Sequence, residues 1–332
     1  MIALLDTSDD SIISWQLASL LVALGVLGLV IGGHLLVSGA VSVAKRLGMS
    51  TLMIGLTIVA LGTSAPELAL NVVAAAGGET GLAFGNVVGS NIANIALVLG
   101  LTALVAPIPI PRATLRLGGI PWLIYLTLLA IALPWFGGIS GDVPGYARWA
   151  GIVLLCCVPL TILLWHRDHR LEEAHGDVDD MPERSLLPSS LLVLAGLVLL
   201  IAGGRSTEVG AVTLAKWMGL SEAVIGLSIV ALATSLPEIV TSMVAARKGV
   251  PNLAIGTVIG SNVFNLSLVL GTTSIVSPVA LPEAGGMIDL FVMGGLTLAL
   301  LPMALTGRRI AKSEGVVLLI IWAAAITLSI LR

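Results

Sequence analysis

The stretch Ile54-Gly-Leu-Thr-Ile-Val-Ala-Leu-Gly-Thr-Ser-Ala-Pro-Glu67 is followed, 171 positions later, by Ile225-Gly-Leu-Ser-Ile-Val-Ala-Leu-Ala-Thr-Ser-Leu-Pro-Glu238. The same offset aligns residues 33–100 with residues 204–271 without a gap, and about half of the aligned residues are identical. The chain therefore contains an internal repeat, and a structural prediction for one copy applies to the other.

The composition predicts an integral membrane protein. Of the 332 residues, 57% are hydrophobic and 11% are charged, and the mean hydropathy is +1.07. A soluble domain carries about 25% charged residues, so this chain lacks the polar surface of a water-soluble fold. Its aliphatic runs show no strand-like alternation, which excludes an outer-membrane barrel and predicts an all-α bundle. The net charge of −3 and the lack of a basic tract argue against a nucleic acid partner.

Ten segments are long and apolar enough to be transmembrane helices, which need about 20 residues each. They lie near residues 13–38, 51–76, 82–105, 117–137, 145–165, 188–212, 222–247, 253–277, 286–306 and 312–331. Lys and Arg gather in the odd-numbered connections, as at Lys45 and Arg46, whereas the even-numbered ones carry acidic residues such as Glu79. Since positive loops stay in the cytoplasm, both termini are predicted to lie outside.

The repeat is predicted to be inverted, because each copy holds five spans and an odd number reverses the direction of entry into the membrane. The first five-helix repeat is assigned to residues 1–165, with its repeated core segment at about 51–105. A cytoplasmic connecting loop at 166–187 leads to the second repeat, 188–332, with its core at 222–277. Inverted repeats of this kind are typical of secondary transporters, whose ion sites lie near the membrane midplane.

Two glutamates in the repeated stretches are the strongest candidates for a site. Glu67 and Glu238 lie well inside predicted spans, where a carboxylate costs about 2.5–3.5 kcal/mol and so marks function. Pro66 and Pro237 precede them and break the helices, which frees backbone carbonyls that persist at this depth only beside a cavity or a ligand. Hydroxyl oxygens lie next to both glutamates, on Thr63, Ser64, Thr234 and Ser235.

A second polar motif follows in each repeat. It reads Gly89-Ser90-Asn91-Ile-Ala-Asn94 in the first and Gly260-Ser261-Asn262-Val-Phe-Asn265 in the second. Ser90 and Asn94 share a helix face, as do Ser261 and Asn265, because four residues make about one turn. Helix packing explains the glycines but does not explain two amides in each repeat.

These residues favour Ca²⁺ or Na⁺ as the bound ion, since both take hard oxygen ligands, whereas Zn²⁺ and Cu²⁺ favour His and Cys. Two carboxylates balance one Ca²⁺, and several Na⁺ ions compensate the same charges in turn, so competition for shared ligands produces exchange. The other interpretations are glutamates buried neutral for packing, a Ca²⁺-permeable channel and an intramembrane hydrolase. The last needs a Ser–His or paired Asp constellation at depth, and we do not expect an enzyme.

The two motifs together resemble the alpha-repeats of the cation/Ca²⁺ exchanger superfamily, in its Na⁺/Ca²⁺ exchanger branch. The resemblance covers both repeats and the ten-span layout. It implies a secondary antiporter that exchanges Na⁺ for Ca²⁺ by alternating access, with electrogenic Ca²⁺ extrusion, and no cofactor. An H⁺/Ca²⁺ exchanger of the same fold is the alternative. The resemblance also implies that the first and sixth helices slide over the core. These helices carry Gly32-Gly33 and Gly203-Gly204.

The resemblance further implies roles for individual residues. Glu67 and Glu238 would be the central ligands shared by Ca²⁺ and Na⁺. Backbone carbonyls would come from Thr63, Thr234, Ala60 and Ala231, hydroxyls for flanking Na⁺ sites from Ser64, Ser235, Ser90 and Ser261, and amides at the middle position from Asn94 and Asn265. Some K⁺-dependent relatives carry Asp where this chain has Asn265, which weakens any K⁺ requirement.

The remaining expectations concern surroundings. The lipid bilayer is the expected environment, in a plasma membrane and specifically a prokaryotic inner membrane, with no obligatory protein partner. H⁺, Sr²⁺, Mn²⁺ and Cd²⁺ stay open as further transported ions. Arg205 and Glu208, three residues apart in the sixth span, are predicted to form an ion pair, with a gate role for Glu208 as the alternative. Four tryptophans near span ends are assigned to the aromatic belt: Trp15, Trp122, Trp165 and Trp322.

Overall fold

The computed structural model describes residues 13–136, 144–170, 185–219, 231–283 and 285–330. Helices dominate this part of the chain, and nine of them, in the described ranges, are long and apolar enough to cross a membrane. They span Trp15–Leu47, Thr51–Ala76, Thr80–Val105, Arg112–Trp135, Arg148–Asp168, Leu186–Trp217, Pro251–Val276, Gly286–Thr306 and Lys312–Ser329. The protein is thus an all-helical integral membrane protein. The predicted seventh span, 222–247, is described only from Ala231 onward.

The first half of the chain runs through α8. Its helices are α1 (Trp15–Leu47), α2 (Thr51–Ile54), η2 (Gly55–Val59), α3 (Ala60–Thr63), α4 (Ala65–Ala76), α5 (Thr80–Ala93), η3 (Asn94–Val98), α6 (Leu99–Val105), η4 (Arg112–Leu115), α7 (Ile120–Ala132), η5 (Leu133–Trp135) and α8 (Arg148–Arg170). Two differences from the expected spans concern length. Helix α1 continues to Leu47, and α8 continues five residues into the segment predicted as the connecting loop.

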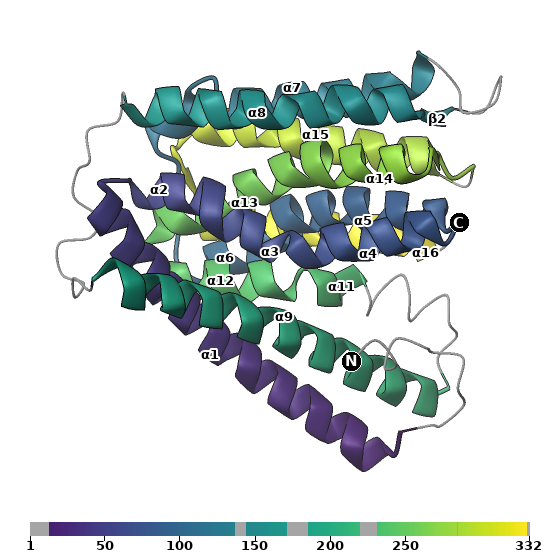
Figure 1. Cartoon of the computed structure of the whole chain (residues 1–332), viewed down its shortest axis with the longest axis horizontal. Coiled ribbons are helices and arrows are strands. Elements are labelled where there is room, and N and C mark those ends of the chain that lie inside the picture. The colour runs from purple at the N-terminus through teal and green to yellow at the C-terminus, as the bar shows by residue number, and fades with distance from the viewer. Residues whose placement is uncertain (1–12, 137–143, 171–184, 220–230, 284, 331–332) are drawn as a thin grey trace.

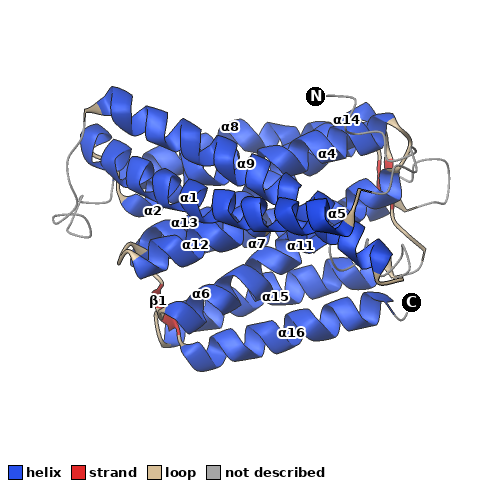
Figure 2. Cartoon of the chain, turned by 90° about the horizontal axis from the view of Figure 1, so that it is seen from below, coloured by secondary structure: helices blue, strands red, loops and turns tan. Residues whose placement is uncertain are grey.

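The second half repeats this order. It contains α9 (Leu186–Trp217), α11 (Ala231–Thr234), α12 (Leu236–Arg247), α13 (Pro251–Phe264), η7 (Asn265–Val269), α14 (Leu270–Val276), α15 (Gly286–Thr306) and α16 (Lys312–Ile330). Two short antiparallel strand pairs, absent from the sequence prediction, tie turns together: β1 (Ile108–Pro109) with β4 (Arg309–Ile310), and β2 (Gly145–Tyr146) with β3 (Val279–Ala280). Figure 2 shows how little strand the fold contains.

The predicted helix breaks are confirmed at equivalent places in the two repeats. Helix α3 ends at Thr63 and α4 begins at Ala65, with Ser64 between them at φ −83° and ψ 0°. In the second repeat Ser235 separates α11 from α12 at φ −88° and ψ 0°. Each proline is the second residue of the new helix, where its missing N–H leaves no hydrogen bond unmade. Each glutamate is therefore the third residue of a helix that starts inside the membrane.

The helices η3 and η7 are π-helical, which the sequence periodicity did not indicate. Asn94–Val98 and Asn265–Val269 differ by the same 171 positions as the two repeats. A π-helical turn widens the helix by one residue per turn and is frequent at functional sites. Here each one begins at a candidate ligand, Asn94 or Asn265.

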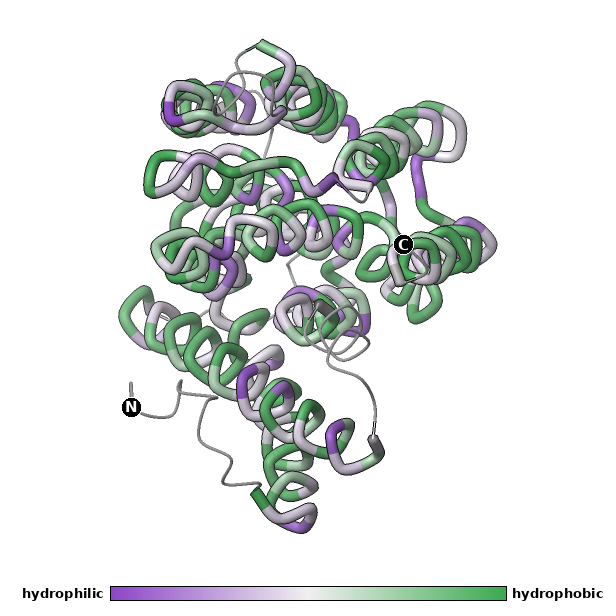
Figure 3. The backbone as a smooth tube through the Cα atoms, turned by 90° about the vertical axis from the view of Figure 1, so that its right-hand side faces the viewer, coloured by the Kyte–Doolittle hydropathy of each residue, from purple (hydrophilic) through white to green (hydrophobic). Residues whose placement is uncertain are grey.

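Helix α13 lies at the centre of the bundle, and all of its residues from Leu253 to Phe264 are buried. The other helices of the main bundle run roughly along the same direction around it (Figure 1). Viewed along this direction, most of the tube is coloured as hydrophobic (Figure 3). Large apolar residues such as Leu163 and Ile320 are exposed, as a lipid-facing surface requires.

Helices α1 and α9 form a separate antiparallel pair that crosses the main bundle obliquely (Figure 1). Glycines seven residues apart allow their backbones to touch. A methyl group at Gly32 would lie 2.9 Å from the carbonyl oxygen of Gly196, and one at Gly203 would lie 2.7 Å from that of Gly25. Small residues at helix crossings are typical of membrane proteins, because close backbone approach replaces the hydrophobic driving force.

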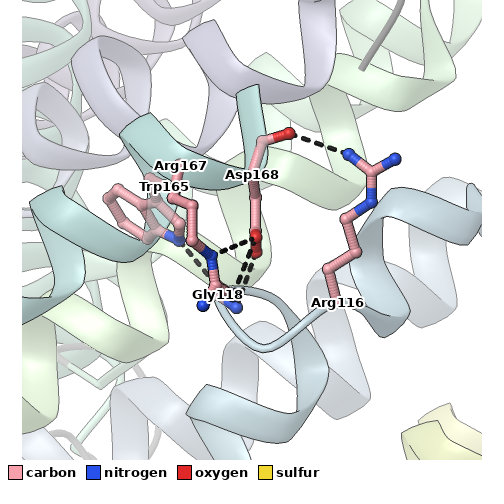
Figure 4. A network of polar contacts seen from close by, with 5 residues as sticks. All are labelled: Arg116, Gly118, Trp165, Arg167 and Asp168. Carbon is pink, nitrogen blue, oxygen red and sulfur yellow. Dashed lines mark hydrogen bonds and ion pairs between the residues drawn. The ribbon is translucent and has the colours of Figure 1, made fainter. Parts of the chain in front are cut away.

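Two tryptophans are not in an aromatic belt, contrary to the sequence prediction. Trp165 is 2% exposed and Trp122 is 5% exposed. The Trp165 indole donates to the Gly118 carbonyl at 2.6 Å, and the Gly118 N–H donates to the Asp168 carboxylate at 2.8 Å (Figure 4). The Arg116 guanidinium donates to the Asp168 backbone carbonyl at 2.8 Å. This network fastens the end of α8 to the turn before α7.

Candidate functional site

The two glutamates lie together inside the bundle. Glu67 is 2% exposed and Glu238 is 1% exposed, and their carboxyl groups are close enough to interact electrostatically. They come from α4 and α12, which have equivalent positions in the two repeats. Each is the third residue of its helix, so the two repeats contribute equivalent positions to this place.

Hydroxyl groups from both repeats surround Glu238. Its carboxyl group lies beside the hydroxyls of Thr63 and Ser261, which belong to different halves of the chain. The Thr63 and Ser261 hydroxyl oxygens are 3.4 Å apart. The end of α3 and the end of α13 are thereby joined to the start of α12. Thr63, Ser261 and Glu238 are all among the predicted ligands, and the structure brings them together.

Several buried oxygens at this place have no hydrogen-bond partner among the residues that the structure describes. They are one carboxyl oxygen each of Glu67 and Glu238, the hydroxyls of Ser64 and Ser235, and the amide oxygens of Asn94 and Asn265. A buried oxygen without a partner costs about 1–3 kcal/mol, more for a charged group. All six come from residues predicted as ligands. A cation bound among them would remove this cost for several oxygens at once.

An amide that the ligand prediction omitted orients one of these oxygens. The Asn94 side chain donates through Nδ2 to Oδ1 of Asn262 at 3.1 Å, and both residues are buried. With Nδ2 held in this way, the Asn94 amide oxygen is the atom left to accept or to bind a cation. The repeated motif does contain Asn262, one residue after Ser261, so it could have been named as a candidate. Its pairing with Asn94 joins distant segments and is not visible in the sequence.

The remaining predicted ligands lie nearby along the chain. Ser90 is buried on α5, four residues before Asn94. The Ala60 carbonyl accepts from the Ser64 N–H at 3.0 Å and from the Thr63 hydroxyl at 3.3 Å. Thr234 ends α11, and Ala231 begins it, at the edge of the described residues.

The donor set is poor in charge and contains only oxygen ligands. Within the described ranges no group of three or more His, Cys, Asp and Glu side chains converges on one place. The site thus combines two carboxylates with neutral hydroxyl, amide and carbonyl oxygens, as hard cations such as Ca²⁺ require.

Two equivalent broken helices that bring two buried glutamates together in a membrane bundle are typical of ion transporters. The family model for the sodium/calcium exchanger protein matches residues 17–164 and 188–331. The chain belongs to this family. Its relatives are transporters and not enzymes.

Individual relatives match nearly the whole chain. CaxA of Alkalimonas amylolytica is 37% identical over 310 residues, which are 91% of this chain and 95% of that protein. The sodium/calcium exchanger MaX1 of Methanosarcina acetivorans is 29% identical over 341 residues, 92% of this chain and 96% of the relative. The solved structure of the sodium-calcium exchanger NCX_Mj soaked with 10 mM Na⁺ and 10 mM Sr²⁺ superposes with a TM-score of 0.81 at 27% identity, covering 95% of this chain and 99% of that one.

Proposed function

We propose that this protein exchanges Na⁺ for Ca²⁺ across the membrane by alternating access, and that it extrudes Ca²⁺ electrogenically. The observation that carries the proposal is the group of buried oxygens around Glu67 and Glu238. A site with two carboxylates and many neutral oxygens binds one Ca²⁺ or several Na⁺ through the same ligands. Occupation by one ion excludes the other, so the carboxylates are neutralised in each crossing and the cost of a buried charge is avoided.

The proposed ligand roles are those that the resemblance to the family implies. Glu67 and Glu238 serve both ions. Thr63, Thr234, Ala60 and Ala231 contribute backbone carbonyls, and Asn94 and Asn265 lie at the middle position. Hydroxyls for flanking Na⁺ sites come from Ser64, Ser235, Ser90 and Ser261. The unpartnered hydroxyls of Ser64 and Ser235 support this assignment, since a proton would need only the carboxylates.

The chain is placed in the membrane as ten spans in two inverted five-helix repeats, with both termini outside. The boundaries proposed are 1–165, 166–187 and 188–332. The bacterial and archaeal relatives support a prokaryotic inner membrane as its location. Helices α1 and α9 move as one body over the site, and their direct backbone contacts at Gly32 and Gly203 support a single moving unit.

The test is ⁴⁵Ca²⁺ uptake into Na⁺-loaded proteoliposomes, with Na⁺, K⁺ or choline outside and the pH clamped on both sides. Uptake is expected only when Na⁺ leaves down its gradient. Glu67→Gln is expected to abolish it, whereas Glu79→Gln, which removes an exposed carboxylate from a turn, is expected to leave it unchanged. Uptake independent of Na⁺ but driven by an imposed pH gradient would overturn Na⁺ coupling and establish H⁺ coupling.

A further inference from the structure

A second group of buried hydroxyls lies outside the proposed ligand set. Thr241 and Ser242 are on α12, and Thr102 is on α6. All three are 0% exposed, and their hydroxyl oxygens have no hydrogen-bond partner among the residues that the structure describes. This is unusual, because a Ser or Thr in a membrane helix ordinarily donates to the carbonyl of the preceding turn.

Other hydroxyls of this chain follow the ordinary pattern. Thr257 donates to the Leu253 carbonyl at 2.9 Å, and Thr273 donates to the Val269 carbonyl at 2.6 Å. Burial alone therefore does not leave a hydroxyl unpaired in this bundle. Three buried hydroxyls without a partner in the protein require a partner from outside it. A water molecule, or a cation bound to the hydroxyl oxygens, meets that requirement.

Two of the three hydroxyls lie on the face of α12 that carries Glu238. Thr241 and Ser242 follow Glu238 by three and four residues, so Ser242 lies about 6 Å further along the axis. Helix α12 packs against α6, which carries Thr102. On α6, Thr102 lies on the side away from Gly100, which contacts α16 through Leu319. From Glu238 the hydroxyls of Thr241 and Ser242 lie toward the turn at residues 247–250, on the side that the Lys and Arg distribution predicts to be cytoplasmic.

The other repeat provides an internal comparison, because the equivalent positions lie on the opposite side of the site. Ser242 corresponds to Asn71, whose Nδ2 donates to the Ala83 carbonyl at 3.2 Å and whose Oδ1 accepts from Asn86 at 2.7 Å. Thr102 corresponds to Thr273, which is bonded to its own helix. Among the described residues, the side chains of Asn71 and Thr273 are thus paired within the protein, whereas those of their equivalents Ser242 and Thr102 are not.

We propose that Thr102, Thr241 and Ser242 form a transient site for a partly hydrated Na⁺ on the cytoplasmic access route to Glu238. The inference rests on the proposed Na⁺/Ca²⁺ exchange. Neutral hydroxyl oxygens without a carboxylate suit a monovalent cation that passes through, since Ca²⁺ sites are built with carboxylates. At the two described positions that are equivalent in the other repeat, Asn71 and Thr273, the polar groups are paired within the protein, so this transient site is proposed for the cytoplasmic side alone.

The experiment is thiol labelling of Ser242→Cys in a background with Cys156→Ser and Cys157→Ser, using a membrane-impermeant cationic methanethiosulfonate reagent. Labelling is expected from the side of the 247–250 turn, and Na⁺ is expected to slow it several-fold. Thr257→Cys is the matched control, since its native hydroxyl is equally buried in the same half but bonded to its own helix. It is expected to stay unlabelled.

Two results would overturn the proposal. Absence of labelling at Ser242→Cys would show that no water-filled route reaches this part of α12. A labelling rate that does not depend on Na⁺ would show a route without a cation site. Transport adds a second readout: Ser242→Ala and Thr102→Val are expected to raise the half-saturating Na⁺ on this side about fivefold, with the opposite side unchanged. If wild-type Ca²⁺ uptake does not depend on Na⁺, the proposed function is wrong. The labelling experiment still shows, independently of transport, whether a water-filled route reaches Ser242.

Discussion

Asn262 offers a quantitative test of how the site is built. Its Oδ1 accepts the 3.1 Å hydrogen bond that leaves the Asn94 amide oxygen unpartnered. Asn262→Ala removes this acceptor, so the Asn94 amide is free to rotate and loses its preferred orientation. The net contribution of such a bond is about 0.5–1.5 kcal/mol. If this orientation is used to bind Ca²⁺, the half-saturating Ca²⁺ rises about 2- to 13-fold.

The assay is Na⁺-dependent ⁴⁵Ca²⁺ uptake as a function of Ca²⁺ concentration, with the maximal rate and the thermal midpoint measured alongside. Asn91→Ala is the matched control. Asn91 occupies the equivalent position in the other repeat and is equally buried, but its Nδ2 donates to Val87 of its own helix at 2.7 Å. The same atoms are lost without loosening Asn94. An equal rise in half-saturating Ca²⁺ in both variants, or none in Asn262→Ala, would refute the positioning role.

Four further predictions follow from single contacts. Glu238→Gln should abolish exchange while the protein stays folded, as judged by gel filtration; transport at the wild-type rate would remove Glu238 from the site. Asn265→Asp should keep activity but change its dependence on Na⁺, K⁺ and pH, and identical ion profiles would count against Asn265 at the middle position. Gly196→Ala places a methyl group 2.5 Å from the Leu36 backbone nitrogen, so it should lower the free energy of unfolding by about 1–3 kcal/mol and with it the thermal midpoint. Gly28→Ala, whose methyl group would lie 3.5 Å from its nearest neighbour, should be tolerated. Equal thermal midpoints for the two variants would contradict the close α1–α9 packing. Lys248→Ala should change the ratio of the two side-specific Ca²⁺ affinities, because Lys248 joins α12 to α1, and an unchanged ratio would show that this junction does not bias the transport states.

The sequence was most informative where the repeat supplied two copies of one signal. The helix breaks at Ser64 and Ser235 were predictable because proline has no N–H to donate and clashes with the preceding turn. The ion pair of Arg205 and Glu208, at 2.7 Å, was predictable from spacing on one helix. Both depend only on residues close in sequence.

What the sequence could not provide depends on contacts between distant segments. The bond from Asn94 to Asn262 joins residues 168 positions apart. The π-helical turns at Asn94 and Asn265 have no periodicity of their own, since one widened turn shifts the apolar pattern by a single residue. Trp165 was assigned to the membrane surface because it lies near a span end, but α8 extends to Arg170 and holds its indole against Gly118.

The differences between the two repeats bear on the transport cycle. In the proposed transporter, two identical inverted repeats would give inward-open and outward-open states of equal energy, because the two-fold rotation that relates the repeats converts one state into the other. This chain departs from that symmetry at the end of α12, where the Lys248 ammonium donates to the Ser38 hydroxyl at 2.5 Å and to the His34 carbonyl at 3.1 Å. The equivalent of Lys248 in the first repeat is Gly77, which has no side chain to reach α9. The junction therefore stabilises α1 against α12 without a counterpart, and a bias of about 1.4 kcal/mol changes the ratio of the two states tenfold.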